Sequence, residues 1–220
     1  MILPLLFGFS IDSAIKLFID ADLSNYFDFT DIKIDNILDS YGIYSNEDVL
    51  IPLEKMLEHK NINKKITLKE LYDLNNKNFV LKTVNISNGE TEYLNHETRP
   101  DLEVIMGIRM TSCIPLIFQP VKYKEGLYID GGVCGNFPIE YIKKEYNIFG
   151  LNITSKRNIE INNLLDYLNQ FQKIIWRHID KLTHINNERI INFNIFGKPI
   201  HFEEDIELKK KYVNEGYHLT

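Results

Sequence analysis

Two kinds of apolar pattern occur along the chain, a continuous apolar run and a helical period, and the first 20 residues contain both. Residues 2–7 form a short apolar run that Gly8 ends, which is typical of a buried strand. Over residues 11–19 the apolar side chains recur at helical spacing, so they share one face. Ser10 directly precedes this segment, at the position of an N-cap. The pattern predicts a strand, a sharp turn at Gly8 and a helix that begins after Ser10.

Caps, turns and periodicity predict the elements that follow. A Thr-x-x-Glu capping box begins at Thr67, and Asn88-Gly89 is a strong hairpin turn. A helix is expected to begin at Pro100, because proline and acidic residues favour a helix start. The elements predicted in this part are short surface helices over 22–50, helices over 46–59 and 68–74, strands over 79–86 and 91–94, a helix over 100–110 and a strand over 117–123.

The second half of the chain continues the alternation of strands and helices, which indicates an α/β sheet packed on both faces. The predicted elements are a strand over 126–129, a glycine-rich loop over 130–138, a helix over 138–144, a buried strand over 147–153, a helix over 158–185, a strand over 189–196 and a helix over 204–214 that ends at Gly216. The sequence has no internal repeat, low-complexity tract or long linker. We therefore expect residues 1–220 to form a single domain.

Composition and charge narrow the classes of function. The net charge is −6 and the isoelectric point is about 5.6, which argues against a nucleic-acid partner and against purely electrostatic docking on anionic lipid. Two cysteines cannot form a disulfide framework, so a reducing compartment is expected. The first residues carry no basic segment before the apolar run, and this run is too short to span a bilayer. The sequence therefore predicts a cytoplasmic protein without a signal peptide or transmembrane segment.

Two segments carry residues that are suited to catalysis. Gly8-Phe-Ser10-Ile-Asp12 keeps the first glycine and the serine of a G-x-S-x-G nucleophile elbow, but Asp12 stands at the place of the second glycine. An elbow exposes its serine hydroxyl at a helix N-terminus, which is where Ser10 is expected. The alternative interpretation of Ser10 is an ordinary N-cap.

The second segment is Asp130-Gly131-Gly132, which ends a predicted strand. Glycines there allow a sharp backbone turn behind a carboxylate that faces a cleft, where it can act as a general base. The alternative interpretation is a β-turn with a solvated aspartate.

Taken in chain order, these segments and three others resemble the patatin-like phospholipases. The motifs that carry the resemblance are Gly8-Phe-Ser10-Ile-Asp12-Ser13, Ile66-Thr-Leu-Lys-Glu-Leu71, Ile108-Arg-Met-Thr-Ser112-Cys-Ile-Pro115-Leu-Ile-Phe118-Gln-Pro120-Val121, Tyr128-Ile-Asp130-Gly131-Gly132-Val133 and Asn136-Phe-Pro138-Ile139. The stretch from Ser112 to Pro138 is the most specific part. The resemblance is clearest over residues 1–155 and fades beyond them.

The resemblance implies a three-layer α/β fold with a mostly parallel central sheet. It also implies a lipid acyl hydrolase, a phospholipase A or carboxylic-ester hydrolase, that uses a serine–aspartate dyad. Ser10 matches the family nucleophile and Asp130 matches the dyad aspartate, while Gly131 and Gly132 shape the site. A serine hydroxyl needs an adjacent base, and in this dyad a carboxylate accepts its proton. The implied substrate is a lipid or acyl ester, met in transient contact with a membrane surface, and no metal or organic cofactor is implied.

The chain departs from the family pattern in two places. The family has a glycine-rich loop before the serine that supplies N–H groups to the oxyanion, but the nine residues before Ser10 contain no such loop. The backbone N–H of Ile11 remains as one donor, and loss of a single donor typically costs roughly 10²–10³ in rate. Asp12 places a negative charge near the developing oxyanion, although it suits the first turn of a helix.

These departures support an alternative function. A patatin-like domain without its first strand has an open sheet edge, which can pair with a protein partner. The alternative to the hydrolase is therefore a catalytically inactive relative that acts as a lipid- or protein-binding module.

Histidine and cysteine residues offer weaker candidates. A Ser-Asp-His triad that uses His178 or His201 is an alternative to the dyad. The histidines and cysteines lack metal-ligand spacing, so no metal site is predicted. Cys113 and Cys134 flank the motifs, and they either approach each other in the cleft or are small buried residues.

Overall fold

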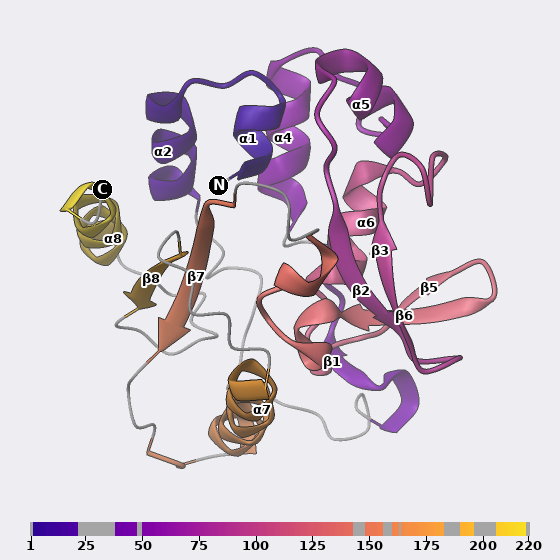
Figure 1. Cartoon of the computed structure of the whole chain (residues 1–220), viewed down its shortest axis with the longest axis vertical. Helices are drawn as coiled ribbons and strands as arrows, with labels where there is room; N and C mark the ends of the chain where they lie inside the picture. The colour runs from indigo at the N-terminus through magenta and orange to yellow at the C-terminus, as the bar shows by residue number, and fades with distance from the viewer. Residues whose placement is uncertain are drawn as a thin grey trace. The chain divides into compact units, whose positions relative to one another are not determined.

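The computed structural model divides the chain into two compact units, Met1–Gly132 (unit 1) and Val133–Thr220 (unit 2), which are described separately here (Figure 1). Both units mix helices and strands, which confirms the predicted α/β class. The structure describes residues 2–21, 38–47, 50–142, 148–155, 160–162, 164–182, 190–195 and 206–218.

Unit 1 contains most of the predicted motifs. Its helices are α1 (Ile2–Leu6), α2 (Ile11–Asp20), α4 (Ile51–His59), α5 (Leu68–Asn75) and α6 (Val104–Thr111). Its strands are β1 (Gly42–Tyr44), β2 (Leu81–Asn85), β3 (Glu90–Leu94), β4 (Leu116–Phe118), β5 (Val121–Tyr123) and β6 (Gly126–Asp130).

A short 3₁₀ helix, Gly131–Cys134, leads from β6 into unit 2. The further elements of unit 2 are a 3₁₀ helix (Ile139–Tyr141), β7 (Gly150–Ser155), α7 (Leu164–Leu182), β8 (Ile190–Ile195) and α8 (Ile206–His218).

The described strands form one antiparallel sheet and two parallel pairs. The four-stranded sheet has the order β3-β2-β6-β5 and is antiparallel throughout, while β1 pairs with β4 and β7 with β8 in parallel. Parallel pairing, which was predicted for most of the sheet, is therefore present in the pairs β1-β4 and β7-β8. The larger sheet departs from it because tight turns join β2 to β3 and β5 to β6, and such turns permit only antiparallel pairing.

The first predicted strand is wrong, because residues 2–6 form the helix α1. Pro4 lies at the centre of this apolar run and has no backbone N–H. A proline at that place would interrupt a sheet ladder, whereas the first turn of a helix tolerates it. The turn at Gly8 and the N-cap at Ser10 are confirmed, and α2 begins at Ile11.

Several predicted helix boundaries are shifted. The helix expected from Pro100 begins at Val104, since the carbonyl oxygens of Pro100 and Leu102 accept the N–H groups of Lys69 and Leu68 at 3.1 and 2.9 Å. This pairing holds residues 100–102 against the start of α5 and keeps them out of the helix.

Other predicted elements also differ from the structure. The helix expected over 46–59 begins at Ile51, and the strand β1 before it was not predicted. The strand expected over 117–123 is divided at Pro120 into β4 and β5. The last helix continues through Gly216 to His218. Of the helix predicted over 138–144, residues 139–141 form a 3₁₀ helix. Residues 22–37 of the predicted surface helices and residues 143–144 of that helix lie outside the described residues.

Local signals with a clear physical cause are confirmed. The Thr67 side chain accepts the Glu70 N–H, and the Glu70 carboxylate accepts the Thr67 N–H, which completes the capping box of α5. Strands β2 and β3 pair in antiparallel register around the Asn88-Gly89 turn. The long helix and the strand predicted in the last third appear as α7 and β8. The strand β7 was predicted to be buried, but its Leu151 and Ile153 side chains are exposed.

The core of unit 1 lies between its helices and the four-stranded sheet. Helix α6 packs against β2 and β6, as Figure 1 shows. The fully buried side chains include Leu57, Leu68, Leu71, Leu94, Leu102, Met110 and Ile117. This packing fixes the carboxyl end of β6, where the predicted aspartate lies.

Candidate active site

Ser10 lies at an exposed corner between α1 and α2. Its backbone is extended, with φ −69° and ψ 159°, and its side chain accepts the Ser13 N–H at 3.2 Å. The Ser10 and Ser13 hydroxyl oxygens are 2.9 Å apart. The N-cap interpretation of Ser10 is confirmed, and its hydroxyl is exposed. The strand that a nucleophile elbow has before its turn is replaced by the helix α1, so the role of Ser10 as a nucleophile stays a prediction.

The corner is held in place by the ends of two neighbouring helices. Gly8 has a φ of 74°, which lets the chain reverse before Ser10. The Lys60 ammonium donates to the Gly8 carbonyl at 3.0 Å, and the Asn75 amide donates to the Leu6 carbonyl at 3.0 Å. Phe9 is buried and stacks against the His59 ring with a centroid distance of 6.2 Å. The corner therefore has a defined shape although its serine is exposed.

Ile11 and Asp12 occupy the exposed first turn of α2. The first N–H groups of a helix have no partner within the helix, so the backbone N–H of Ile11 has no acceptor in α2, and its role as an oxyanion donor stays a prediction. The Asp12 carboxylate suits the positive end of the helix dipole, but it lies on the same turn as this donor.

Asp130 ends β6 in a half-buried position. Its N–H donates to the Cys113 carbonyl at 2.8 Å, and its carboxylate accepts the Gly132 N–H at 2.7 Å. Burial raises the pKa of Asp130 to about 6, while the hydrogen bond from Gly132 acts in the opposite direction. A carboxylate with this pKa is suited to act as a general base near neutral pH.

The two glycines after Asp130 have separate roles. A side chain at Gly131 would place its Cβ 2.3 Å from the backbone oxygen of Lys82 on β2, so only glycine fits there. Gly132 supplies the N–H that orients the Asp130 carboxylate. Asp130 therefore does not lie in a solvated β-turn, because it ends the strand β6 and is half-buried.

Ser10 and Asp130 both belong to unit 1, but each has its own partners. Among the described residues of that unit, no hydrogen bond joins the two side chains. Their pairing in a dyad stays a prediction.

The sequence motifs pointed to Cys113 without indicating its role. Its side chain is fully buried and donates to the Gln119 carbonyl at 2.9 Å. Burial, with a further effect of the Asp130 charge, raises the pKa of the Cys113 thiol to about 12. A neutral thiol of this kind is inert, so Cys113 supports the strand end and is unsuited to nucleophilic attack. Neither cysteine forms a disulfide, and Cys134 is exposed, which corrects its interpretation as a small buried residue.

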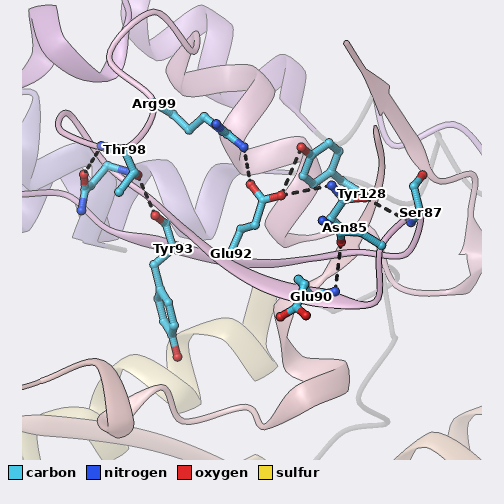
Figure 2. Close-up of polar contacts among 10 residues, drawn as sticks. Asn85, Ser87, Glu90, Glu92, Tyr93, Thr98, Arg99 and Tyr128 are labelled. Carbon is cyan, nitrogen blue, oxygen red and sulfur yellow. Dashed lines mark hydrogen bonds and ion pairs between the residues drawn. The ribbon is translucent and has the colours of Figure 1, made fainter. Parts of the chain in front are cut away.

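A polar cluster beside β6 was not predicted from the sequence. The Glu92 carboxylate on β3 accepts hydrogen bonds from Arg99 at 2.7 Å and from Asn85 at 3.1 Å, and the Tyr128 hydroxyl reaches it at 3.4 Å (Figure 2). Tyr128 precedes Asp130 by two residues on β6, so this cluster fixes the strand that carries the aspartate. Its residues come from three strands and a loop, and no local sequence pattern marks such a cluster.

The histidines of the triad alternative do not belong to unit 1. His178 is exposed on α7 in unit 2, and His201 lies outside the described residues, so the triad alternative stays untested. Within the described ranges, no group of three or more His, Cys, Asp or Glu side chains is arranged to hold a metal ion. Across those same ranges, we find no helix with the length and apolar character that a bilayer crossing requires.

Comparison with known protein families decides the family. Residues 3–143, which are more than half of the chain and include both Ser10 and Asp130, match the patatin-like phospholipase family. The chain belongs to the patatin-like phospholipase family. The match confirms the resemblance that the sequence motifs indicated.

Two viral proteins are similar to this patatin-like chain. Probable lipid hydrolase 463L of Invertebrate iridescent virus 6 is 36% identical over 106 residues, which cover 48% of this chain and 37% of that protein. Uncharacterized protein R571 of Acanthamoeba polyphaga mimivirus is 24% identical over 222 aligned positions, which cover 94% of this chain and 73% of that protein. The chain thus spans little more than a third of the viral lipid hydrolase.

A solved structure supports the patatin-like fold. The crystal structure of VipD from Legionella pneumophila matches with a TM-score of 0.50 and 19% identity, over 94% of this chain and 44% of VipD. At this identity the similarity concerns the fold alone. Membership of the patatin-like phospholipase family and an α/β fold are therefore established for this chain.

Proposed function

We propose that this chain is a lipid acyl hydrolase, a phospholipase A or carboxylic-ester hydrolase, in which Ser10 is the nucleophile and Asp130 is the base. The observation that carries the proposal is the patatin-like match over residues 3–143, because it includes both residues. The name of the 36% identical viral relative, a probable lipid hydrolase, supports the same class of substrate.

The local chemistry of each residue supports its role. Ser10 is exposed at the N-terminus of α2, where the helix dipole favours the negative charge that develops during acyl transfer. Asp130 has a pKa of about 6, so it is mostly ionised at neutral pH yet basic enough to accept a proton. The reaction requires the Ser10 hydroxyl and the Asp130 carboxylate within roughly 2.6–3.2 Å of each other, in place of their present partners Ser13 and Gly132.

The proposed reaction has two steps. Ser10 transfers its proton to Asp130 and attacks the ester carbonyl, and the tetrahedral oxyanion forms beside the Ile11 N–H. The intermediate then expels the alcohol, which takes the proton from Asp130 and leaves the acyl group on Ser10. Water attacks this acyl-enzyme while Asp130 accepts its proton, and the proton returns to Ser10 as the fatty acid leaves. The cycle consumes one water and needs no cofactor.

Hydrolysis of a short acyl-nitrophenyl ester tests the dyad. We expect the parent chain to release nitrophenol above the buffer rate and Ser10→Ala to fall to that rate. Asp130→Asn should lose about 10²–10⁴-fold, the usual contribution of a general base. Ser45→Ala, at another exposed serine, is the matched control and should keep parental activity. Full activity in Ser10→Ala, or none in a folded parent, would rule out the proposal.

A catalytically inactive binding module is the second candidate. Two observations favour it: the Ser10 hydroxyl is engaged in capping α2, and the Asp12 carboxylate lies on the turn that would bind the oxyanion. A protein partner would then pair with a sheet edge, and in the four-stranded sheet of unit 1 the edges are β3 and β5. The nitrophenyl ester assay separates the two candidates, because an inactive module leaves the buffer rate unchanged.

The proposed substrate is a lipid or acyl ester met at a membrane surface. Such a substrate requires transient contact with lipid. We also propose that the chain acts in the cytoplasm.

A further inference from the structure

Two threonine hydroxyls lie next to the strand end that carries Asp130. The Thr111 hydroxyl, at the end of α6, donates to the Lys82 carbonyl at 2.6 Å. The Thr83 hydroxyl on β2 donates to the Ile129 carbonyl on β6 at 2.7 Å. Both donors are side chains and both acceptors are backbone carbonyls, so the two bonds fix the backbones of β2 and β6.

Asp130 closes these two bonds into a ring. Its N–H donates to the Cys113 carbonyl at 2.8 Å, and Cys113 follows Thr111 by two residues. The remaining links are covalent, because the bonded residues of β2 are neighbours in sequence and so are those of β6. The ring thus returns to its start. We call it the hydroxyl ring, and its members are Thr111, Lys82, Thr83, Ile129, Asp130 and Cys113.

The hydroxyl ring lies where the ladder between β2 and β6 ends. The register pairs Val84 with Ile129, and it pairs Thr83 with Asp130 as the last pair. The Asp130 N–H donates to Cys113 and not to β2. The Thr83 hydroxyl therefore supplies a side-chain bond from β2 to the peptide that leads into Asp130.

This peptide, between Ile129 and Asp130, is held at both of its polar atoms. Its carbonyl oxygen accepts the Thr83 hydroxyl, and its N–H donates to Cys113. Because a peptide is planar, two such bonds fix its plane and with it the direction in which the Asp130 side chain leaves the backbone. The carboxylate then accepts the Gly132 N–H at 2.7 Å. Since both threonine hydroxyls donate to carbonyls, their effect on the carboxylate passes through the backbone.

The burial of Thr83 indicates that its hydroxyl has a role beyond packing. The side chain is fully buried, with 0% of its surface exposed. Valine has nearly the same shape and can be buried without a polar group, whereas a buried hydroxyl is stable only with a hydrogen-bond partner. The bond to Ile129 is therefore a feature that apolar packing of β2 does not require.

We propose that Thr83 and Thr111 are positioning residues for Asp130, which hold its carboxylate toward the Gly132 N–H through the hydroxyl ring. Thr83 acts on the peptide before Asp130. Thr111 acts one step farther away, on the Lys82 carbonyl, beside which only glycine fits at position 131. The inference rests on the proposed function only in treating Asp130 as a base whose direction matters.

Titration of the Asp130 carboxyl group by carbon-13 NMR tests the positioning without a substrate. The Asp130 signal is identified by its loss in Asp130→Asn, and in the parent we expect a pKa of about 6. In Thr83→Val the carboxylate loses the Gly132 N–H, a bond that lowers its pKa, so the pKa should rise by about 0.5–1 unit. The neighbouring Cys113 thiol has a pKa of about 12 and stays neutral throughout the titration.

Two control variants separate positioning from stability. Thr83→Ser keeps the hydroxyl but loses a buried methyl group, so it should be less stable to urea than the parent and still titrate like the parent. Thr98→Val removes a matched bond, because the Thr98 hydroxyl donates to the Tyr93 carbonyl on β3 at 2.7 Å (Figure 2). It should also leave the Asp130 titration unchanged. A purely structural role of Thr83 would instead give pKa shifts that follow the loss of stability.

A double variant tests whether the bonds act as one ring. Thr111→Val alone should raise the Asp130 pKa, and adding it to Thr83→Val should raise the pKa no further than the larger single effect, because the ring is already open. Additive shifts would overturn the ring. Thr111 is less buried than Thr83, so Thr111→Val also provides the test if Thr83→Val does not fold.

The outcomes for this inference and for the proposed hydrolase are separate. An unchanged or lowered Asp130 pKa in the folded valine variants overturns the inference, and so does an equal rise in Thr83→Ser or Thr98→Val. If the parent hydrolyses the nitrophenyl ester, the acid limb of its pH profile should move with the Asp130 pKa in Thr83→Val. If the parent is inactive and the titrations follow the expected pattern, the positioning holds and only the hydrolase proposal fails.

Discussion

At the scale of single residues, the ionised form of Asp130 that the proposed chemistry requires lowers the stability of the folded chain. Burial at the end of β6 favours the protonated form, whereas the proposed chemistry requires the ionised form. The hydrogen bond from the Gly132 N–H offsets only part of the burial. The chain therefore holds a carboxylate whose ionisation at neutral pH is costly, which is common where a base must act.

This conflict predicts a pH dependence of stability. The pKa of Asp130 rises from 3.8 to about 6 on folding, so between these values the folded state binds the proton more tightly than the unfolded state. The free energy of unfolding should then fall by roughly 2–3 kcal/mol as pH rises through this range. Asp130→Asn should remove that fall and be more stable than the parent at pH 7.

Urea unfolding of both chains at a series of pH values measures the effect. Asp101→Asn, at an exposed aspartate, serves as the control and should keep the parental slope. Parallel curves for the parent and Asp130→Asn would mean that Asp130 is solvated in solution.

Gly131 is predicted to tolerate no side chain. A Cβ there would lie 2.3 Å from the Lys82 backbone oxygen, so β2 and β6 would have to separate. We expect Gly131→Ala to lose at least about 1–3 kcal/mol of unfolding free energy, as overpacked sites do. Gly8→Ala is the comparison, because a Cβ at Gly8 meets no atom within 4 Å and pays only for its φ of 74°, about 1–2 kcal/mol. Thermal unfolding ranks the two, and a larger loss at Gly8 would contradict the close approach at Gly131.

At the scale of elements, capping determines where the helices begin. Helix α5 has a complete capping box, with Thr67 and Glu70 bonded to each other's backbone N–H groups. Helix α2 has a serine cap, which binds Ser13. Helix α6 has no side-chain cap, and its start is set instead by the pairing of the preceding loop.

Thr67→Ala is predicted to destabilise unit 1 by about 0.5–2 kcal/mol, because it removes the acceptor for the Glu70 N–H. Glu70→Gln should cost less, since glutamine also serves in a capping box. Urea unfolding followed by circular dichroism gives both values. An Ala variant as stable as the parent would show that packing alone holds α5.

The difference between helices that begin at a side-chain cap and helices whose start depends on distant contacts explains which elements could be predicted from the sequence. Helices α2 and α5 and the hairpin of β2 and β3 carry local signals, namely Ser10, Thr67 and Asn88-Gly89, and each is confirmed. Helix α1 was predicted as a strand because an apolar run gives no period, although Pro4 was a signal against pairing. The late start of α6 depends on hydrogen bonds to α5, which no local pattern contains.

At the scale of the whole chain, the family could be predicted from the sequence, while the pairing of the proposed dyad could not. The linear series of motifs indicated the patatin-like family, and the match over residues 3–143 confirms it. Whether Ser10 meets Asp130 depends on how segments far apart in the sequence approach each other, which motif order does not determine. The close supports of Asp130, namely Cys113 and the Glu92 cluster, likewise come from contacts between distant strands.

Labelling of the intact chain with a fluorophosphonate tests the central claim most directly, because this reagent reacts only with an activated serine. The account predicts one adduct, mapped to Ser10 by peptide mass spectrometry and absent in Ser10→Ala. Its rate should rise as the pH passes about 6, where Asp130 ionises, and that rise should disappear in Asp130→Asn. An adduct on another residue, or no adduct on a folded chain, would contradict the account.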